Sequence, residues 1–448
     1  MSSHSQIAQS EEDKKSWGSG GLFGNRALGS LVLLLLTPVF VLTFWSCCKH
    51  HGGSFQSLFS FAIENKFSEV IAEIYPTPFD PYCWKLILSY MAFELTLMKI
   101  VPGKIFKATT TPSGHVPVYI ANGIQCYTIT IIALFLCAYY NIFNPADVYD
   151  NMGKLLSSIN LFAVVFCLLL MFKGLYFPST ADSGSNGNVL VDYFWGTELY
   201  PRILGWDVKQ FTNCRFGMMF WQVGILCFAW KQVQLQGGLS SSMLVNVLLQ
   251  SVYIAKFFWW ETGYFCSMDI QHDRAGYYIC WGCLVWVPGM YTIHSYFLVE
   301  HPVLLSLPVA GLMLLAGVLC IWCNYDCDRQ RQEFRATSGR TKIWGREPQF
   351  VTASYVTEGG EERTSLLLVS GWWGLARHFH YIPEILASFF WCLPALFSHP
   401  LPYFYPVYLT LLLLDRAWRD DKRCADKYGA HWDEYCRRVP YKIIPGLL

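Results

Sequence analysis

The chain has 448 residues, of which 53% are hydrophobic and only 15% are charged, and its formal net charge is +1. A soluble globular chain carries nearer a quarter charged residues, so this composition excludes an ordinary soluble protein. No basic patch interleaved with aromatic residues stands on a soluble segment, so nothing points to nucleic-acid binding. The composition therefore predicts a protein of the lipid bilayer.

Long apolar runs recur along the chain, and a helix of about 20 such residues crosses a hydrocarbon core of about 30 Å. The first run follows a polar, Ser-rich tail and lacks a clear cleavage site, so we expect it to be a retained span. We predict an all-α, polytopic integral membrane protein with about ten transmembrane helices. The last two runs are short and aromatic, which leaves a tilted or re-entrant arrangement open. The ten ranges are 27–46, 83–98, 118–140, 156–177, 216–230, 243–260, 277–298, 303–323, 382–397 and 403–414.

The 17 cysteines lie mostly inside these apolar runs, where Cys usually behaves as a small hydrophobic residue. Cys280 and Cys283 have the spacing of a redox or zinc motif, but no second ligand pair accompanies them. We therefore expect them to be structural and predict no metal site.

Three domains are predicted: a polar tail (1–26), a transmembrane core (27–323), and a part (324–448) made of polar segments and the last spans. The longest polar segment, 324–382, contains a helix-like stretch at 326–340 and two alternating stretches, 349–357 and 363–369, around a turn at 358–360. Nearly half of the Lys and Arg residues, 16 of 33, lie in this segment and in residues 411–448. Both parts are therefore expected to face the cytosol.

The C-terminal stretch, residues 411–448, passes abruptly from an apolar run to a dense set of charged and aromatic residues. If the last span continues as a helix, Arg416, Asp420, Cys424 and Tyr428 recur at four-residue steps, and Tyr435 lies two turns beyond. Such a collar could simply anchor the helix at the water interface. It could equally form a cytosol-facing pocket for an anionic cofactor.

Two further clusters in the cytosolic part suit a cofactor. Arg331 and Arg335 are four residues apart on the helix-like stretch, and guanidinium groups bind phosphate in a bidentate manner. Trp373, Arg377, His378, His380 and Tyr381 lie close together just before a span, and flat rings beside hydrogen-bond donors suit a nicotinamide or adenine ring. The two histidines could alternatively bind a metal, but no carboxylate or Cys at ligand spacing accompanies them. An ordinary positively charged loop remains the alternative for the arginines.

Ionisable residues also stand around the predicted seventh span, and such residues at membrane depth are candidates for function. They could supply a proton, although a short polar loop explains them as well. No Gly-rich motif of a dinucleotide-binding or phosphate-binding loop is present, so a nucleotide would not be held by a Rossmann fold. The residues are Glu261, Asp269, His272, Asp273 and Arg274.

Together these motifs resemble the sterol reductase family, whose members reduce double bonds of sterols with NADPH. Residues 413–436 resemble the second signature of that family almost throughout, and residues 196–202 resemble the first. Segments 256–264, 272–288, 324–335, 370–385 and 439–446 are most similar to the branch that reduces the sterol Δ7 bond. Two positions depart from the common pattern: Tyr200 and His380 stand where many relatives have Asn.

The resemblance implies NADPH-dependent reduction of the C7–C8 double bond of Δ5,7-sterols in the endoplasmic reticulum membrane. The implied partners are the membrane sterol, the bilayer and other enzymes of sterol biosynthesis. The implied cofactor contacts are Arg331, Arg335, Leu368, Trp373, His380, Tyr381, Arg416, Asp420, Cys424, Tyr428 and Tyr435.

A ring alkene is a poor hydride acceptor, so one carbon must be protonated before hydride arrives. Asp420 is the first candidate for this acid or for organising it, and Glu261 and Asp273 are the second candidates. A sterol C14-reductase shares both signatures and is the nearest alternative. An integral-membrane methyltransferase using S-adenosylmethionine shares the C-terminal pattern but is much shorter. A non-enzymatic nuclear-membrane scaffold would be expected to have a basic N-terminal region, which the short, nearly neutral tail does not supply.

Overall fold

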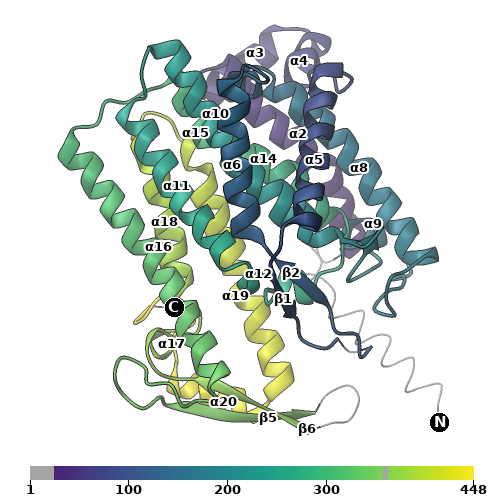
Figure 1. Ribbon diagram of the computed structural model, residues 1–448, viewed down its shortest axis with the longest axis vertical. Coiled ribbons are helices and arrows are strands. Elements are labelled where there is room, and N and C mark those ends of the chain that lie inside the picture. Colours follow the sequence, from purple (N-terminus) through teal and green to yellow (C-terminus); the bar gives the residue numbers. More distant parts are fainter. Residues whose placement is uncertain (1–24, 112, 357–361, 448) are drawn as a thin grey trace. The chain divides into compact units, whose positions relative to one another are not determined.

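The computed structural model describes residues 25–111, 113–356 and 362–447, and most of these residues lie in helices. The predicted turn at 358–360 and nearly all of the predicted polar tail lie outside the described residues. The chain divides into two units, Met1–Met243 with Ile254–Pro302 and Leu244–Tyr253 with Val303–Leu448. Figure 1 shows the helices of each unit and their labels.

The first unit is built from α2 (Arg26–His50), α5 (Pro81–Ile100), α6 (Gly123–Tyr139), α8 (Met152–Tyr176) and α10 (Met218–Gln236). The starts of these helices follow from local chemistry. Asn25 caps α2 by accepting hydrogen bonds from the amides of Ala27 and Leu28, and Asp80 caps α5 just before Pro81. Shorter helices connect them: α3 (Phe55–Glu64), α4 (Phe67–Ile74), α7 (Ala146–Asp150), α9 (Val189–Trp195), α12 (Glu261–Tyr264) and α13 (Met268–Gln271).

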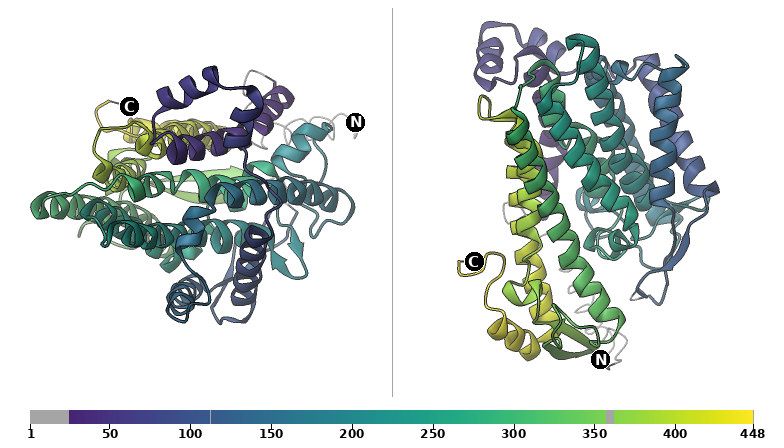
Figure 2. Two further views of the ribbon diagram at one scale, coloured as in Figure 1. Left: turned by 90° about the horizontal axis from the view of Figure 1, so that it is seen from above. Right: turned by 60° about the vertical axis from the view of Figure 1, so that its left-hand side comes forward.

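The second unit contains α16 (Leu307–Ala336), α18 (Tyr381–Cys392) and α19 (Phe404–Tyr428), and α18 packs on both of the others. Figure 2 shows these helices from two further sides. The short helices α17 (Trp372–Leu375) and α20 (Ala430–Arg438) and an antiparallel pair of strands, β5 (Phe350–Val356) and β6 (Glu362–Leu368), complete the unit. Helix α11 (Ser241–Trp259) contributes its central residues to this unit.

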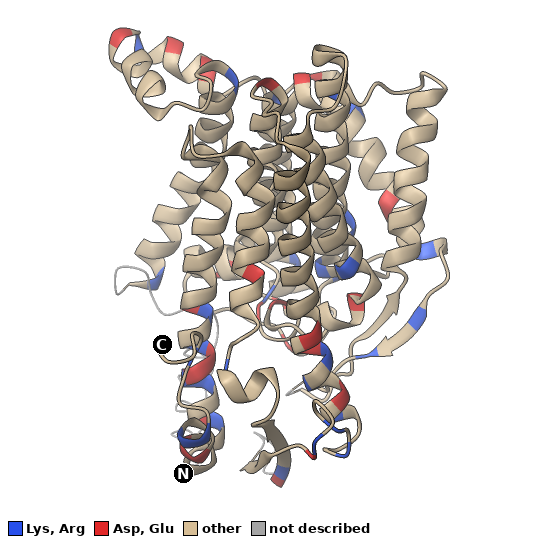
Figure 3. Ribbon diagram, turned by 90° about the vertical axis from the view of Figure 1, so that its left-hand side faces the viewer, with Lys and Arg blue, Asp and Glu red and all other residues tan. Residues whose placement is uncertain are grey.

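Each of the ten predicted apolar ranges contains helix over at least part of its length, and the fold is mostly helical. Among the described residues, four helices are long and apolar enough to cross a membrane: α2, α8, α11 and α16. The number of crossings, about ten, stays a prediction. Charged residues gather mainly near helix ends and in the connections, as Figure 3 shows.

Three expectations about elements need correction. Residues 118–121 form a strand, β2 (Val118–Ala121), that pairs with β1 (Lys104–Lys107), so the helix expected from residue 118 begins at Gly123. The helix-like stretch expected at 326–340 is not a separate helix: residues 326–336 are the end of α16, which continues unbroken through residue 323, and the helix ends at Ala336. The expected seventh span is divided into a π-helical segment (Tyr277–Trp286), α14 (Val287–Met290) and α15 (Ile293–Glu300), where Pro288 has no amide proton to continue the helical ladder.

The two alternating stretches near 349–369 do form a hairpin. Its register pairs Phe350 with Leu368 and Val356 with Glu362. One face of the pair packs Val351, Ala353 and Leu367 into a cluster with residues of α20. The hairpin thereby supports the last helices of the chain.

Candidate functional site

Several segments of the second unit bring the predicted C-terminal site residues together. Arg331 and Arg335 stand near the end of α16, Trp373 belongs to α17, and Asp420 lies on α19. Members of this group from different segments lie near one another. Arg335 lies near Cys424, Tyr428 and Tyr435, and Tyr381 lies near Arg331, Arg416 and Asp420.

Trp373 is fixed against α16 on two sides. Its indole nitrogen donates a hydrogen bond to the carbonyl of Cys327 at 2.7 Å, and the guanidinium of Arg331 lies over its ring, 4.1 Å from the centroid. Such a cation–π contact keeps a guanidinium in a defined plane. Leu368, at the end of β6, is buried in a cluster with Trp373 and Phe334. Its side chain therefore supports the tryptophan.

The neighbouring Trp372 is held by polar groups of the same helix. Its indole nitrogen donates to Asp326 at 2.8 Å, and its amide donates to the side-chain oxygen of Gln330 at 3.3 Å. Gln330 also donates to Asp326 at 2.9 Å, and both side chains are buried. Gly371 precedes this turn with a φ of +63°, a conformation that favours glycine. Asp326 and Gln330 thus fix the turn that presents the tryptophans.

Asp420 faces a buried histidine. The Nε2 atom of His378 lies 3.8 Å from Oδ2 of Asp420, and Oδ1 of Asp420 accepts a hydrogen bond from Arg423. Burial lowers the pKa of His378 to about 4, so its imidazole is neutral near neutral pH. Tyr381 stacks on His378 with 5.2 Å between ring centroids. The carboxylate of Asp420 therefore lies next to both the imidazole of His378 and the guanidinium of Arg423.

The residues around 439–442 are bound into the same group. The amides of Arg377 and His378 donate to the carbonyls of Tyr441 and Lys442 at 3.0 and 2.8 Å. The guanidinium of Arg377 donates to the carbonyl of Val439 at 2.8 Å. Its Nε atom also lies 3.3 Å from Oδ1 of Asp421. Residues 439–442 therefore fix the position of the segment that contains Arg377 and His378.

Aromatic rings and a thiol line the neighbouring part of α19 and α20. Trp432 and Tyr435 are buried on the hairpin, and Tyr428 packs against the same cluster. The ring of Tyr355 lies edge-on to Tyr428 at 5.6 Å. Burial raises the pKa of the Cys424 thiol to about 12, so the thiol stays protonated.

The structure thus brings together every predicted cofactor contact of the second unit, with Leu368 as part of its support. Sequence reasoning placed His378 in the cluster before the span but not among the cofactor contacts, and it assigned no role to Asp326 or Gln330. Asp326 and Gln330 could have been noticed, because they lie four residues apart where an apolar helix turns polar. Within the described residues, no group of three or more His, Cys, Asp or Glu side chains could hold a metal ion.

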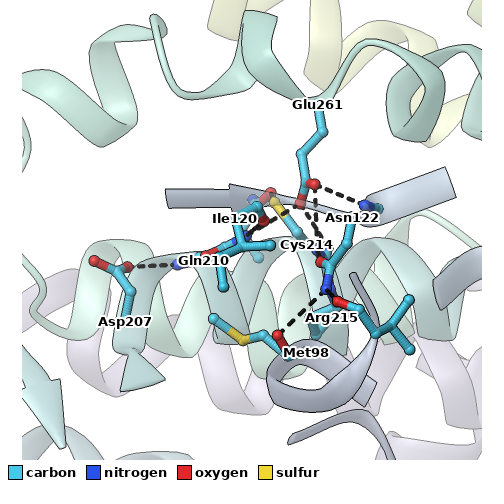
Figure 4. Close-up of polar contacts among 11 residues, drawn as sticks. Met98, Ile120, Asn122, Asp207, Gln210, Cys214, Arg215 and Glu261 are labelled. Atoms are coloured by element: carbon cyan, nitrogen blue, oxygen red, sulfur yellow. Dashed lines mark hydrogen bonds and ion pairs between the residues drawn. The ribbon is translucent and has the colours of Figure 1, made fainter. Parts of the chain in front are cut away.

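Glu261 belongs to a separate, buried polar network in the first unit, drawn in Figure 4. Its two carboxylate oxygens lie 2.6 and 3.2 Å from the two terminal nitrogens of Arg215, in bidentate geometry. The amide of Gly123 donates to the same carboxylate at 2.8 Å, and Arg215 donates to Asn122 at 2.6 Å. Both charged side chains are almost completely buried. This pairing favours a structural carboxylate over a proton donor, since removing its charge would leave Arg215 without its counter-ion.

Asp273 lies in the loop that follows α13 and is buried. Lys209 fixes this loop, because its ammonium donates to the main-chain carbonyls of Asp269, Ile270 and Asp273 at 3.1, 2.7 and 2.8 Å. The chain thus positions Asp273 firmly, and its proposed chemical role stays a prediction.

Comparison with known proteins identifies the family. The profile of the "Ergosterol biosynthesis ERG4/ERG24 family" matches residues 22–448. A "7-dehydrocholesterol reductase" of Arabidopsis thaliana is 53% identical over 93% of this chain and 96% of its own length. A protein of the same name from Xenopus laevis is 38% identical over 81% of this chain and 80% of its own. A "Delta(14)-sterol reductase" of Methylotuvimicrobium alcaliphilum is 34% identical over 93% and 94%. The chain therefore belongs to the ERG4/ERG24 family of ergosterol biosynthesis.

Proposed function

We propose that this protein is an NADPH-dependent reductase of the C7–C8 double bond of Δ5,7-sterols in the endoplasmic reticulum membrane. The main support is the 53% identity, over nearly the whole chain, to a protein named 7-dehydrocholesterol reductase. The Delta(14)-sterol reductase considered above is less similar, at 34% identity. The sterol would enter from the bilayer, and other enzymes of sterol biosynthesis are expected as partners.

The C-terminal group suits NADPH in its residue chemistry. Arg331 and Arg335, one turn apart, would bind phosphate groups in a bidentate manner. The ring centroid of His380 lies 4.9 Å from that of Trp373 and 4.3 Å from that of Tyr381, and the three rings offer flat surfaces to a planar heterocycle. NADPH, when bound, supplies the hydride. Residues 324–448 are accordingly proposed as the cofactor-binding part.

Reduction of a ring alkene also needs a proton, and we assign its delivery to Asp420 or to a group that Asp420 organises. Asp420 is only partly exposed, and His378 and Arg423 both face its oxygens. Nε2 of the neutral His378 imidazole lies 3.8 Å from Oδ2 of Asp420, which is beyond hydrogen-bond length, whereas Arg423 donates directly to this carboxyl. Glu261, paired with Arg215, supports the fold in this proposal, and Asp273 remains the second candidate on the sterol side.

The variant Asp420→Asn tests this assignment, because it preserves shape and removes the acid. We expect binding of NADPH to change by less than about threefold and turnover of 7-dehydrocholesterol to fall by about a hundredfold or more. Cofactor fluorescence and sterol analysis would measure the two effects. Normal turnover in this variant would remove Asp420 from the proton-transfer step.

Substrate and cofactor can be decided in one set of assays on membranes that contain the protein. With NADPH, 7-dehydrocholesterol should be reduced and a Δ8,14-sterol should not. Reduction of the Δ8,14-sterol alone would make the protein a C14-reductase. The protein should be retained on a 2′-phosphate-bearing cofactor resin and released by NADPH but not by S-adenosylmethionine. Failure of this retention would favour the methyltransferase.

A further inference from the structure

The connection between α2 and α5 in the first unit contains two amphipathic helices, α3 and α4. In α3, Phe55, Phe59 and Ile63 follow one another at four-residue steps and share one face, while Ser60 and Glu64 lie on another. In α4, Phe67 and Ile71 repeat the same spacing. Each helix therefore has one apolar and one polar side.

The apolar sides of both helices point away from the rest of the first unit. Phe59 and Ile63 are each 68% exposed, Phe67 is 80% exposed and Ile71 is 46% exposed. The one buried residue of α3 is Leu58 and that of α4 is Val70. A connection that lay in water would turn its large apolar side chains inward. The exposed faces therefore need an apolar environment.

Polar contacts hold the two helices beside the end of α2. For α4, the imidazole of His51 lies 2.8 Å from the carboxylate of Glu73, and Ser46 donates to the same carboxylate at 3.2 Å. For α3, the other ring nitrogen of His51 lies 3.1 Å from the hydroxyl of Ser57. α2 is one of the helices able to cross a membrane, and its last turn carries Lys49 and His50. Figure 1 shows α3 and α4 at this end of α2. They are thus placed where a span leaves the hydrocarbon core.

We propose that α3 and α4 lie in the plane of the bilayer interface and insert Phe59, Ile63, Phe67 and Ile71 among the acyl chains. The lipid-exposed surface of α2, with Leu35 and Leu36 respectively 64% and 59% exposed, precedes them directly in the chain. The pair thereby continues a lipid-facing surface from the core to the headgroup level. Amphipathic helices of this kind bind through buried apolar area.

The charge of the segment identifies the lipid class. Residues 55–74 contain three acidic residues, Glu64, Glu69 and Glu73, against one basic residue, Lys66, so the segment is negatively charged. Anionic headgroups attract clusters of Lys and Arg, which are absent from these residues. A neutral, zwitterionic bilayer surface is therefore the occupant that fits.

Photo-crosslinking in the full chain tests the proposal. p-Benzoylphenylalanine would replace Phe59 or Phe67 in protein reconstituted into phosphatidylcholine nanodiscs, and mass spectrometry after irradiation would identify the adducts. The same residue at Leu36, on the span, is the positive control. At Ser60, on the polar side of α3, it is the matched negative control. Both test positions are exposed aromatic residues, so the change is expected to leave the fold intact.

We expect lipid adducts at Phe59 and Phe67 within about threefold of the Leu36 yield, and about tenfold fewer at Ser60. The yields at Phe59 and Phe67 should not change when anionic lipid is added. Lipid adducts at Leu36 without any at Phe59 and Phe67 would overturn the proposal. Cross-links between two copies of the chain at these positions would instead identify the face as a protein interface.

Discussion

Arg331 and Arg335 stand one helical turn apart on α16, within electrostatic range of each other. If both bind phosphate groups of NADPH, loss of either charge-assisted contact should weaken binding by about 1.5–3 kcal/mol, roughly 10- to 150-fold. Titration of cofactor fluorescence with Arg331→Ala and Arg335→Ala measures this. The control is Arg438→Ala, because Arg438 forms an exposed pair with Glu434. Equal cofactor affinity in all three variants would contradict the proposed phosphate contacts.

The ion pair of Arg215 and Glu261 gives a second prediction for single residues. Glu261→Ala leaves a buried guanidinium without its counter-ion, so it should destabilise the protein by about 3–5 kcal/mol. The double variant Arg215→Met, Glu261→Leu should recover most of that loss, because it removes both charges together. Thermal unfolding in detergent measures stability, and sterol reduction by the double variant measures function. If the double variant folds well but does not reduce the sterol, Glu261 would again be a candidate for a chemical role in the reaction.

At the scale of an element, the turn before α17 depends on a glycine. A Cβ atom at Gly371 would overlap the side-chain oxygen of Gln330 and approach Cγ2 of Ile343 to 2.6 Å. Gly429 is a matched control, since its backbone is similar (φ 51°, ψ −126°, against 63° and −142° at Gly371) and nothing lies near its Cβ position. Both alanine variants store backbone strain of about 1–3 kcal/mol.

Gly371→Ala should therefore lower the unfolding temperature and the affinity for NADPH more than Gly429→Ala does. Combining Gly371→Ala with Gln330→Ala relieves one of the two close contacts and should recover part of the difference. Differential scanning fluorimetry and cofactor titration are the measurements. If the two single alanine variants behave alike, packing of this turn against α16 does not limit cofactor binding.

At the scale of the whole molecule, His378 makes stability depend on pH. Burial lowers its pKa from 6.5 to about 4 in the folded chain. Between these values the unfolded chain binds more protons, so folding loses stability as the pH falls from about 6.5 toward 4, by up to about 3 kcal/mol. His378→Gln should flatten this dependence. Unfolding temperatures of both proteins at pH 7 and pH 5 measure it, and parallel pH profiles would contradict it.

Periodic features of the chain were predictable from its sequence. The four-residue repeat of Arg416, Asp420, Cys424 and Tyr428 indicated the helix that the structure has, and the alternation near 349–369 indicated the hairpin. The helix and the hairpin could both be predicted because the spacing of a repeat depends only on the local geometry of the backbone. The grouping of the distant segments came from the family resemblance, because periodicity in one segment contains no information about its partners.

Other features could not be predicted for a physical reason. Hydropathy indicates where a helix leaves lipid and not where the helix ends, so α16 was expected to stop near residue 323 although it reaches Ala336. Pairing of Arg215 with Glu261 depends on how the chain folds in space, and neither residue has a spacing that identifies the other. The same holds for Asp326 and Trp372, which are separated by 46 residues.

The hydrogen bonds between Arg377–His378 and the carbonyls of residues 441–442 have a consequence for biosynthesis. During translation α16 emerges first, yet the group around His378 cannot close before residue 442 has been made. α18 and α19 must be in place by then. Until that moment the arginines of α16 and the tryptophans of α17 lack their final neighbours. Ribosome stalling or a premature stop codon within this stretch would leave a membrane-inserted intermediate with an unfinished polar face, which is the kind of species that quality-control proteases recognise.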